Sequence, residues 1–471
     1  MDRPREHSLD ALRIALDGKM LVRRDGDYAH ACQAWNQAWT HRPAAVIAAA
    51  HERDVITTVR HAAAHGYKVV VQSTGHGVTV PADEQSILIT MAGLDHVTID
   101  AVQRTATIGG GTAWNPVLEK AQEHGLAPLL GSAPHVGAIG YTLGGGFGWL
   151  ARKHGLAVDS VTSLRIVLAD GRAVTASQDE NPDLFWAMCG AGGGSLGVVV
   201  EATIRLAPAT DVYAGNLMYP IDQAREAFGF FQNWSARAPR ELTSAFNITA
   251  FPPLDIVPEP LRGKAFAIVR GCFSGDLGEG QALIDEWRAW CAPAMDMFGP
   301  MPFARCAEIS QDPVDPVPAA SNGKWLSGID EAVLDAMLGA VTGGPGPSPM
   351  LFAELRHGGG AISEPNSTVS YSGRDGAYSL EMVGLITGPD ADAELDRRFS
   401  DTWKQLRGHL AERSGYLNFT EGQERIAAAT SAFNRKTWNR LHAIKREHDP
   451  ANVFSHGIDL ARRRGLMGAR R

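Results

Sequence analysis

The sequence predicts an α+β protein built from two domains, and three observations support this prediction. A β-α-β unit near the N-terminus combines apolar strands at 46–48 and 68–72 with a helix over 52–65, whose apolar residues recur at helical spacing. Beyond Pro208, short strands alternate with helical patterns and are separated by proline- and glycine-rich segments. The 471 residues also exceed what one simple hydrophobic core usually organises. We therefore expect a second domain in which helices back an antiparallel sheet.

The elements before residue 208 follow from local patterns. Gly66 provides a stop for the helix of the β-α-β unit, and Asp170-Gly171 between two apolar runs is a strong hairpin signal. The other expected elements are a helix over 8–18, strands over 87–89, 97–100, 105–108, 164–168, 172–176 and 198–206, a helix over 114–124, and a short helix from Pro182.

The second half is expected to supply the antiparallel sheet and its helices. The strands lie over 244–249, 266–269, 351–355 and 378–384, and the helices over 279–291, 331–341, 391–413 and up to 447. We divide the chain into an N-terminal helical segment (1–40), a first domain (41–208), a second domain (209–415), and a C-terminal segment (416–471) that returns to the first domain.

Composition and charge exclude several classes of protein. The net charge of −8 disfavours nucleic acid as a general partner. No apolar run of about 18 residues occurs, so we expect no membrane association. Five scattered cysteines without CxxC spacing favour reduced thiols, and the N-terminus lacks a signal-peptide pattern, so we expect a cytoplasmic protein. His61 and His65 are one helical turn apart but have no third ligand beside them, so we expect no metal site.

Two glycine-rich segments are the main functional candidates. Gln72–Gly77 follows a buried strand and holds His76, and a second loop is expected over Gly137–Gly148. Glycine lets backbone N–H groups approach an anion closely, so these loops suit a large, flat, anionic ligand. Neutral imidazole can act as a nucleophile or a base, but from spacing alone His76 could equally be a structural loop residue. No G-x-S-x-G segment supports a hydrolase triad.

A third glycine-rich run does not carry a dinucleotide site of the Rossmann type. Residues 192–197 match GxGxxG, a pattern that binds a pyrophosphate only when a strand precedes it and a helix follows. Here a short helix precedes the run and a strand follows it. The order is reversed, and the sequence therefore excludes this interpretation.

Four ordered blocks resemble the berberine-bridge-enzyme-like and 6-hydroxynicotine-oxidase-like flavoproteins of the p-cresol methylhydroxylase/vanillyl-alcohol oxidase superfamily. The resemblance covers nearly the whole chain, and residues 42–208 look like the FAD-binding domain. The blocks are Gln72–Gly77, Gly137–Asp159, Asn181–Ala187 with Gly192–Val199, and the terminal pair Tyr416–Phe419 and Asp449–Phe454. The resemblance implies a two-part FAD-binding domain of the p-cresol methylhydroxylase type and a substrate domain with an antiparallel sheet backed by helices.

The resemblance also implies how the cofactor is held. The family's Arg-Ser-Gly-Gly-His loop, whose histidine is linked to the 8α carbon of the flavin, is here Gln-Ser-Thr-Gly-His, so His76 is expected to hold FAD covalently. Ala133 stands where many relatives have a second linking cysteine, which leaves a single link. The expected FAD-binding residues are Gln72, Ser73, Thr74, Gly75, His76, Gly77, Ser132, Pro134, Gly137, Gly140, Tyr141, Gly144, Gly145, Gly146, Gly148, Gly197, Val199, Asn418 and Asn452.

Four residues are candidates for catalysis. Alternation on an extended 416–419 puts Tyr416 and Asn418 on one face, and relatives place these two positions beside the flavin. A buried, backbone-bonded tyrosine is the alternative for Tyr416. Glu354 and Glu381, on strands of the substrate sheet, could be the base or could be salt-bridged. His135 lies in a loop expected to border the flavin. The family's second tyrosine is replaced by Phe419, and an arginine by Cys189.

The expected function is that of an FAD-dependent oxidase or dehydrogenase. The resemblance implies hydride removal from a small organic substrate (an alcohol, sugar, amine or secondary metabolite) and transfer of the electrons to O2. A flavin-dependent oxygenase or cyclase that tailors a natural product is the alternative. A flavin-binding protein without catalysis is a further alternative, because the second tyrosine is missing. A monomer or homodimer is expected.

Overall fold

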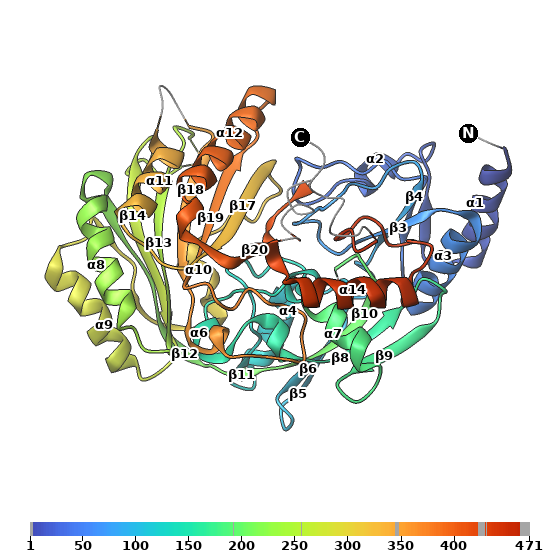
Figure 1. Cartoon of the computed structure of the whole chain (residues 1–471), viewed down its shortest axis with the longest axis horizontal. Coiled ribbons are helices and arrows are strands. Elements are labelled where there is room, and N and C mark those ends of the chain that lie inside the picture. Colours follow the sequence, from blue (N-terminus) through green and yellow to red (C-terminus); the bar gives the residue numbers. More distant parts are fainter. Residues whose placement is uncertain are drawn as a thin grey trace.

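The computed structural model describes residues 3–191, 193–255, 257–343, 348–422, 429 and 431–461. Two sheet-based halves lie side by side, with the N-terminal half on the right of Figure 1 and a large sheet on the left. The α+β class and the antiparallel sheet backed by helices are confirmed.

The N-terminal half contains two separate sheets. The first has the order β1-β2-β4-β3, in which β2, β4 and β3 are parallel, as a β-α-β unit requires. The second is antiparallel, with the order β5-β6-β10-β8-β9. Their strands are β1 (Lys19–Leu21), β2 (Ala45–Ala48), β3 (Lys68–Gln72), β4 (Ser86–Thr90), β5 (Val97–Asp100), β6 (Thr105–Gly109), β8 (Val161–Val167), β9 (Ala173–Ser177) and β10 (Val198–Arg205). A further pair joins β7 (Leu126–Ala127) to β11 (Ala207–Pro208).

The helices of this half pack against these sheets. The helix of the β-α-β unit ends as expected, with Gly66 in the left-handed region at φ 73°. The helices are α1 (Arg3–Ala15), α2 (Tyr28–Ala31), α3 (Glu52–His65), α4 (Trp114–Gln122), α5 (Ala138–Leu143), α6 (Ala151–His154) and α7 (Pro182–Ala191). The expectation of an irregular loop over Gly137–Gly148 is wrong in its first part, because α5 begins directly after Gly137.

The large sheet forms the second half. Its strands follow the order β15-β12-β14-β13-β18-β19-β17-β20, and β16 pairs with β12. They are β12 (Asp211–Pro220), β13 (Leu242–Ala250), β14 (Ala265–Phe273), β15 (Met295–Asp296), β16 (Gly299–Pro302), β17 (Ala319–Leu326), β18 (Met350–His357), β19 (Tyr378–Leu385) and β20 (Leu410–Thr420). The sequence prediction did not include β12 or β17. The proposed border between residues 415 and 416 falls inside β20.

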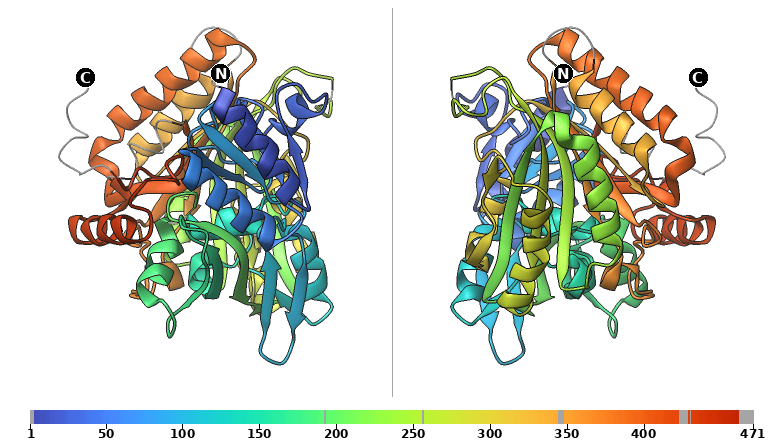
Figure 2. Two further views of the ribbon diagram at one scale, coloured as in Figure 1. Left: turned by 90° about the vertical axis from the view of Figure 1, so that its right-hand side faces the viewer. Right: turned by 90° about the vertical axis from the view of Figure 1, so that its left-hand side faces the viewer.

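Helices cover the outer face of the large sheet, and its other face is turned toward the N-terminal half (Figures 1 and 2). These helices are α8 (Ala224–Ala236), α9 (Leu277–Trp290), α11 (Glu331–Thr342) and α12 (Pro389–Gln405), with α10 (Ala307–Ser310) and α14 (Arg435–His448) elsewhere. The prediction of a helix through residue 413 is wrong, because α12 ends at Gln405 and β20 begins at Leu410. No helix in the described part of the chain has the length and apolar character needed to cross a membrane.

One hydrophobic core joins the two halves. It contains Leu143 and Phe147 from the N-terminal half together with Trp325 and Tyr416 from the large sheet. The rings of Phe147 and Trp325 stack with centroids 5.5 Å apart. Because core side chains pack closely, this shared core fixes the glycine-rich segment relative to the sheet.

The segment after α14 is fastened to the N-terminal half by a buried ion pair. Lys445 Nζ lies 2.7 Å from Asp449 Oδ2 and also donates to the Ser195 carbonyl oxygen. The Asp449 carboxylate accepts hydrogen bonds from the backbone N–H groups of Val453 and Phe454. The Val69 N–H of β3 in turn donates to the Val453 carbonyl oxygen at 2.9 Å. The segment after α14 thereby supports β3, the strand that leads to His76.

We predict that Asp449→Ala lowers the free energy of unfolding by about 3–5 kcal/mol, because it leaves the Lys445 ammonium buried without its counter-charge. Urea unfolding followed by circular dichroism measures this change. Asp401→Ala is the matched control, since Asp401 makes ion pairs only with exposed side chains of α12 among the described residues, and should cost less than about 1 kcal/mol. Equal losses in the two variants would contradict the structural role of Asp449.

Candidate flavin site

The two halves enclose a cavity of about 420 Å³, which lies in the range of sites that hold drug-sized ligands. One wall is formed by the loop after β3, by residues 131–141 and by glycines before β10. The opposite wall is formed by cavity-facing residues of the large sheet. The cavity thus places both glycine-rich candidates beside the substrate sheet.

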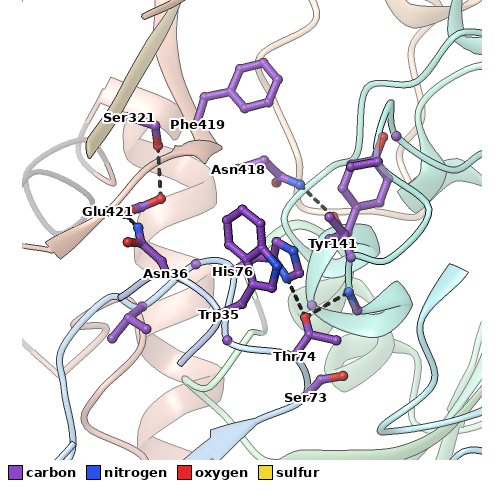
Figure 3. Close-up of a pocket in the computed structure, with 18 of the residues that line it drawn as sticks. Trp35, Asn36, Ser73, Thr74, His76, Tyr141, Ser321, Asn418, Phe419 and Glu421 are labelled. Atoms are coloured by element: carbon purple, nitrogen blue, oxygen red, sulfur yellow. Dashed lines mark hydrogen bonds between the residues drawn. The ribbon is translucent and has the colours of Figure 1, made fainter. Parts of the chain in front are cut away.

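His76 lies in the centre of this cavity wall (Figure 3). The chain leaves β3 at Gln72 and turns back so that Thr74 Oγ1 lies 2.7 Å from His76 Nδ1. The same oxygen accepts a hydrogen bond from the Gly137 N–H at 3.1 Å. Thr74 therefore orients the imidazole and connects the first glycine-rich loop to the N-terminus of α5.

The imidazole of His76 is kept neutral. Burial, and then the neighbouring His135, lowers the pKa of His76 to about 3. The rings of His76 and Trp35 stack at 4.2 Å, and the rings of His76 and His135 lie 5.0 Å apart. His76 Nε2 is buried and has no hydrogen-bond partner among the described residues. A neutral imidazole with one uncommitted nitrogen can act as a nucleophile.

Sequence reasoning missed the contribution of the N-terminal segment to this site. Trp35 and Asn36 both line the cavity. The Trp35 indole N–H donates to the Val314 carbonyl oxygen, and Asn36 Nδ2 donates to Glu421 Oε2 at 2.7 Å. Ser321 of β17 donates to the other oxygen of Glu421 (Figure 3). The one available signal was a pair of tryptophans at 35 and 39 in a polar segment, and that signal is weak.

The glycines of the second glycine-rich segment divide into two groups. A Cβ at Gly148 would lie 1.7 Å from the Leu130 carbonyl oxygen, and one at Gly144 would lie 2.1 Å from Asn418 Oδ1. A Cβ at Gly140 would have no atom within 4 Å, and Gly140 lines the cavity. The first group permits close packing of the protein on itself, whereas Gly140 leaves room for a ligand.

Charged side chains line the sheet side of the cavity. Glu354 is 2% exposed, and its two oxygens accept hydrogen bonds from the guanidinium groups of Arg356 and Arg270. Burial alone would raise the pKa of Glu354, but Arg356 and Arg270 lower it to about 2. Arg356 also donates to the Phe147 carbonyl oxygen at 2.7 Å and is thus tied to the opposite half. Glu354 is a salt-bridged carboxylate and a poor base.

Glu381 has the opposite electrostatic character. It lies directly opposite Glu354 in the pairing of β18 with β19 and lines the cavity. Burial raises the pKa of Glu381 to about 8, and the neighbouring carboxylates of Glu354, Asp312 and Glu421 add to this, while Arg356 opposes it. Two adjacent carboxyl groups with pKa values moved in opposite directions suit different roles in proton transfer.

The alternation expected for residues 416–419 is wrong. Asn418 and Phe419, which are consecutive, both line the cavity, whereas Tyr416 is completely buried and lies outside the cavity wall. The reason is a large irregularity in the pairing of β17 with β20. Asn322 pairs with Thr420 and Lys324 pairs with Gly415, so a two-residue step along β17 corresponds to a five-residue step along β20. The Tyr416 hydroxyl has no hydrogen-bond partner in the described structure, so the backbone bond considered for it is not present.

The structure brings most of the expected site residues to the cavity. Lining residues include Gln72, Ser73, Thr74, Gly75, His76, Gly77, Ser132, Gly137, Gly140, Tyr141, Gly197, Val199, Asn418, His135, Glu354 and Glu381. Outside the wall lie Pro134, Gly144, Gly145, Gly146, Gly148, Asn452 and Tyr416. Asn452 instead accepts a hydrogen bond from Lys68 Nζ at its carbonyl oxygen. Gly192 lies outside the described residues.

Comparison with known proteins identifies the class to which this site belongs. Residues 43–177 match the family model described as an FAD binding domain. The chain is 32% identical over 470 residues to (R)-6-hydroxynicotine oxidase of Paenarthrobacter nicotinovorans, with 96% of this chain and 98% of that protein covered. The chain is therefore an FAD-dependent oxidoreductase. It belongs to the family of FAD-linked oxidoreductases that includes 6-hydroxynicotine oxidase.

Solved structures share the fold. The xylooligosaccharide oxidase of Myceliophthora thermophila superposes with a TM-score of 0.81 at 24% identity, covering 96% of this chain and 98% of that one. The berberine bridge enzyme of Eschscholzia californica gives a TM-score of 0.80 at 20% identity, again covering 96% and 98%. The resemblance found in the sequence is confirmed.

The residues present fit FAD. Ser73 Oγ, His76 Nε2 and Asn418 Oδ1 are buried polar atoms without hydrogen-bond partners among the described residues. All three residues line the cavity and would gain partners from a large polar ligand. Gly137 and Gly140 would hold the cofactor at the N-terminal turn of α5, and Ser73 and His76 would hold it at the loop after β3.

We predict opposite outcomes for two glycine substitutions in the second glycine-rich segment. Gly140→Ala should leave the stability of the FAD-free protein unchanged or raise it by up to about 1 kcal/mol, because alanine favours the helix, yet it should lower FAD incorporation by narrowing the cavity. Gly148→Ala should destabilise the fold with or without FAD, because its Cβ meets backbone. Thermal unfolding and flavin absorbance per protein measure both effects. Full FAD loading of Gly140→Ala would contradict a cofactor position beside Gly140.

Proposed function

We propose that this protein is an FAD-dependent oxidase that holds FAD by a single covalent link through His76. It removes a hydride from a small organic substrate (an alcohol, sugar, amine or secondary metabolite) and passes the electrons to O2. The observation that carries the proposal is the neutral, oriented imidazole of His76, whose Nε2 is buried at the cavity wall without a hydrogen-bond partner among the described residues.

The hydrogen bonding of His76 supports its role as the linking nucleophile. Thr74 Oγ1 already accepts from the Gly137 N–H, and it has a second lone pair for a proton on His76 Nδ1. In that tautomer the Nε2 lone pair is available at the cavity wall. The stacked Trp35 ring restricts rotation of the imidazole. Ala133 lines the same cavity and has no nucleophilic atom, which supports a single link.

Bound FAD supplies the hydride acceptor, and the chain supplies the base that removes the accompanying proton. Among the candidates, Glu381 suits this role best. Its pKa of about 8 lies near physiological pH, whereas the Glu354 carboxylate is held by two arginines. Tyr416 lies outside the cavity wall, and burial raises the pKa of its hydroxyl well above the usual value. His135 remains a candidate for substrate contact beside His76.

The class of substrate is supported by the shape and chemistry of the cavity. Phe352, Val383 and Phe419 give the sheet side an apolar surface next to the charged groups. That combination suits an organic molecule with a polar reacting group. The names of the two oxidases with similar sequence or fold support O2 as the acceptor. All five cysteines are unpaired thiols, which supports the cytoplasm as the location.

We predict that His76→Ala releases its flavin when the protein is precipitated with acid, while the wild-type precipitate stays yellow. The covalent bond requires an imidazole nitrogen at this position. Flavin absorbance of precipitate and supernatant, together with the intact protein mass, measures the link. His135→Ala is the matched control, because it removes the neighbouring imidazole and should keep the acid-stable flavin. Acid-stable flavin in His76→Ala would disprove the assignment.

We predict that flavin reduction by a turnover substrate accelerates as the pH rises through about 8, since a base acts only when deprotonated. Glu381→Gln should slow reduction by about 10²–10⁴-fold and remove this pH dependence. Anaerobic stopped-flow bleaching of the flavin measures both effects. Glu279→Gln, at an exposed position on α9, is the control with unchanged rates. A wild-type pH profile retained in Glu381→Gln would exclude Glu381 as the base.

A further inference from the structure

Arg270 of β14 is a second cation at the sheet side of the cavity. It is 9% exposed and lines the cavity. In the strand register it lies opposite Asn216 of β12 and Ala245 of β13. Its Nη1 donates to Glu354 Oε2 at 2.7 Å, but its Nε is buried and has no hydrogen-bond partner in the described part of the chain. A buried guanidinium N–H without an acceptor is costly unless a ligand or water supplies one.

Ser310 also lines the cavity, and its side chain also lacks a hydrogen-bond partner among the described residues. It is the last residue of α10, is 6% exposed and lines the cavity. Its hydroxyl is buried and makes no hydrogen bond to any described residue. Asn216 Nδ2 donates to the Ile309 carbonyl oxygen at 3.2 Å, which fixes α10 beside the strand that pairs with Arg270. Arg270 and Ser310 are therefore two donors on neighbouring elements that both line the cavity.

Two guanidinium groups and several carboxyl groups line this cavity, and Asp312, two residues after Ser310, is one of those carboxyl groups. The single Glu354 carboxylate is shared by the guanidinium groups of Arg356 and Arg270. The raised pKa of Glu381 keeps that carboxyl largely protonated at neutral pH, so it supplies little compensating charge. Among the described ion pairs, Arg270 is joined only to Glu354. The Glu421 carboxylate is bonded to Ser321 on β17, four strand positions away from β14 in the sheet.

We propose that Arg270 and Ser310 form a subsite for a carboxylate of the substrate, so that this enzyme oxidises an organic acid whose reacting carbon lies toward Glu381. This rests on the oxidase function proposed above. The carboxylate accepts hydrogen bonds from the Arg270 guanidinium, whose Nε has no partner among the described residues, and from the Ser310 hydroxyl. The apolar surface of Phe352 and Val383 then contacts the body of the substrate.

The test uses the flavin-loaded protein and two probes of the same shape, benzoate and benzamide. Isothermal titration calorimetry and the shift in the flavin spectrum measure binding without turnover. Benzoate is expected to bind the wild type about tenfold or more tightly than benzamide, because hydrogen bonds to charged groups are stronger than neutral ones. Arg270→Lys retains a cation for Glu354 but loses the guanidinium fork, and should abolish this preference. Ser310→Ala should weaken benzoate binding several-fold.

The controls separate this subsite from the proposed oxidase function. Arg225→Lys, which alters an exposed arginine paired with Asp335, should keep the preference for benzoate. Equal binding of benzoate and benzamide, or a preference that survives both Arg270→Lys and Ser310→Ala, overturns the subsite. If Arg270→Lys fails to fold, loss of benzoate binding in Ser310→Ala alone supports the subsite, and unchanged binding overturns it. The acid-stability result for His76 decides the covalent link independently, whatever the probes show.

Discussion

The aromatic contact between Phe147 and Trp325 lies in the core on which the whole site depends. These rings belong to the glycine-rich segment and to the large sheet, and they stack within a core that both halves share. Arg356 strengthens the same junction by donating to the Phe147 carbonyl oxygen while it holds Glu354. Because a close-packed core resists small displacements, the loop with His76 and the strands with the carboxylates keep a fixed separation. A planar cofactor and its substrate need such a rigid gap.

Two of the carboxyl groups that line the cavity, those of Glu354 and Glu381, have different environments although they are register partners on β18 and β19. Glu354 is ionised because two guanidinium groups surround it, whereas burial, with a smaller contribution from the Glu354 charge, raises the pKa of Glu381 to about 8. Burial also keeps His76 neutral, by lowering the pKa of its imidazole to about 3. Desolvation supplies most of both shifts, so closure of the cavity by the two halves determines the chemistry of these side chains.

Three residues between α2 and β2 of the N-terminal half also line the cavity: Trp35, Asn36 and His41. Trp35 stacks on His76, and Asn36 reaches Glu421 at the end of the substrate sheet. Gln72 donates to the Gln33 carbonyl oxygen and contacts His41. Gln72 thus holds the stretch from Gln33 to His41 against the end of β3. The stretch between α2 and β2 has little regular structure, and contacts with cavity side chains hold it in position.

The sequence by itself determined most of the strands and helices of the first domain and the presence of an antiparallel sheet, and its resemblance to a known family indicated the flavin class and His76. The elements follow from local spacing and the resemblance follows from ordered glycine blocks, both of which depend on neighbours along the chain. Only the tertiary structure decided that Tyr416 lies outside the cavity wall, that Glu354 is ionised between two arginines while the pKa of Glu381 is raised to about 8, and that Arg270, Ser310 and Trp35 line the cavity. The physical reason is that a pairing irregularity, a pKa and an unsatisfied donor arise from groups far apart in sequence. Residues 35, 270 and 310 line one cavity only because the fold brings distant parts of the chain together.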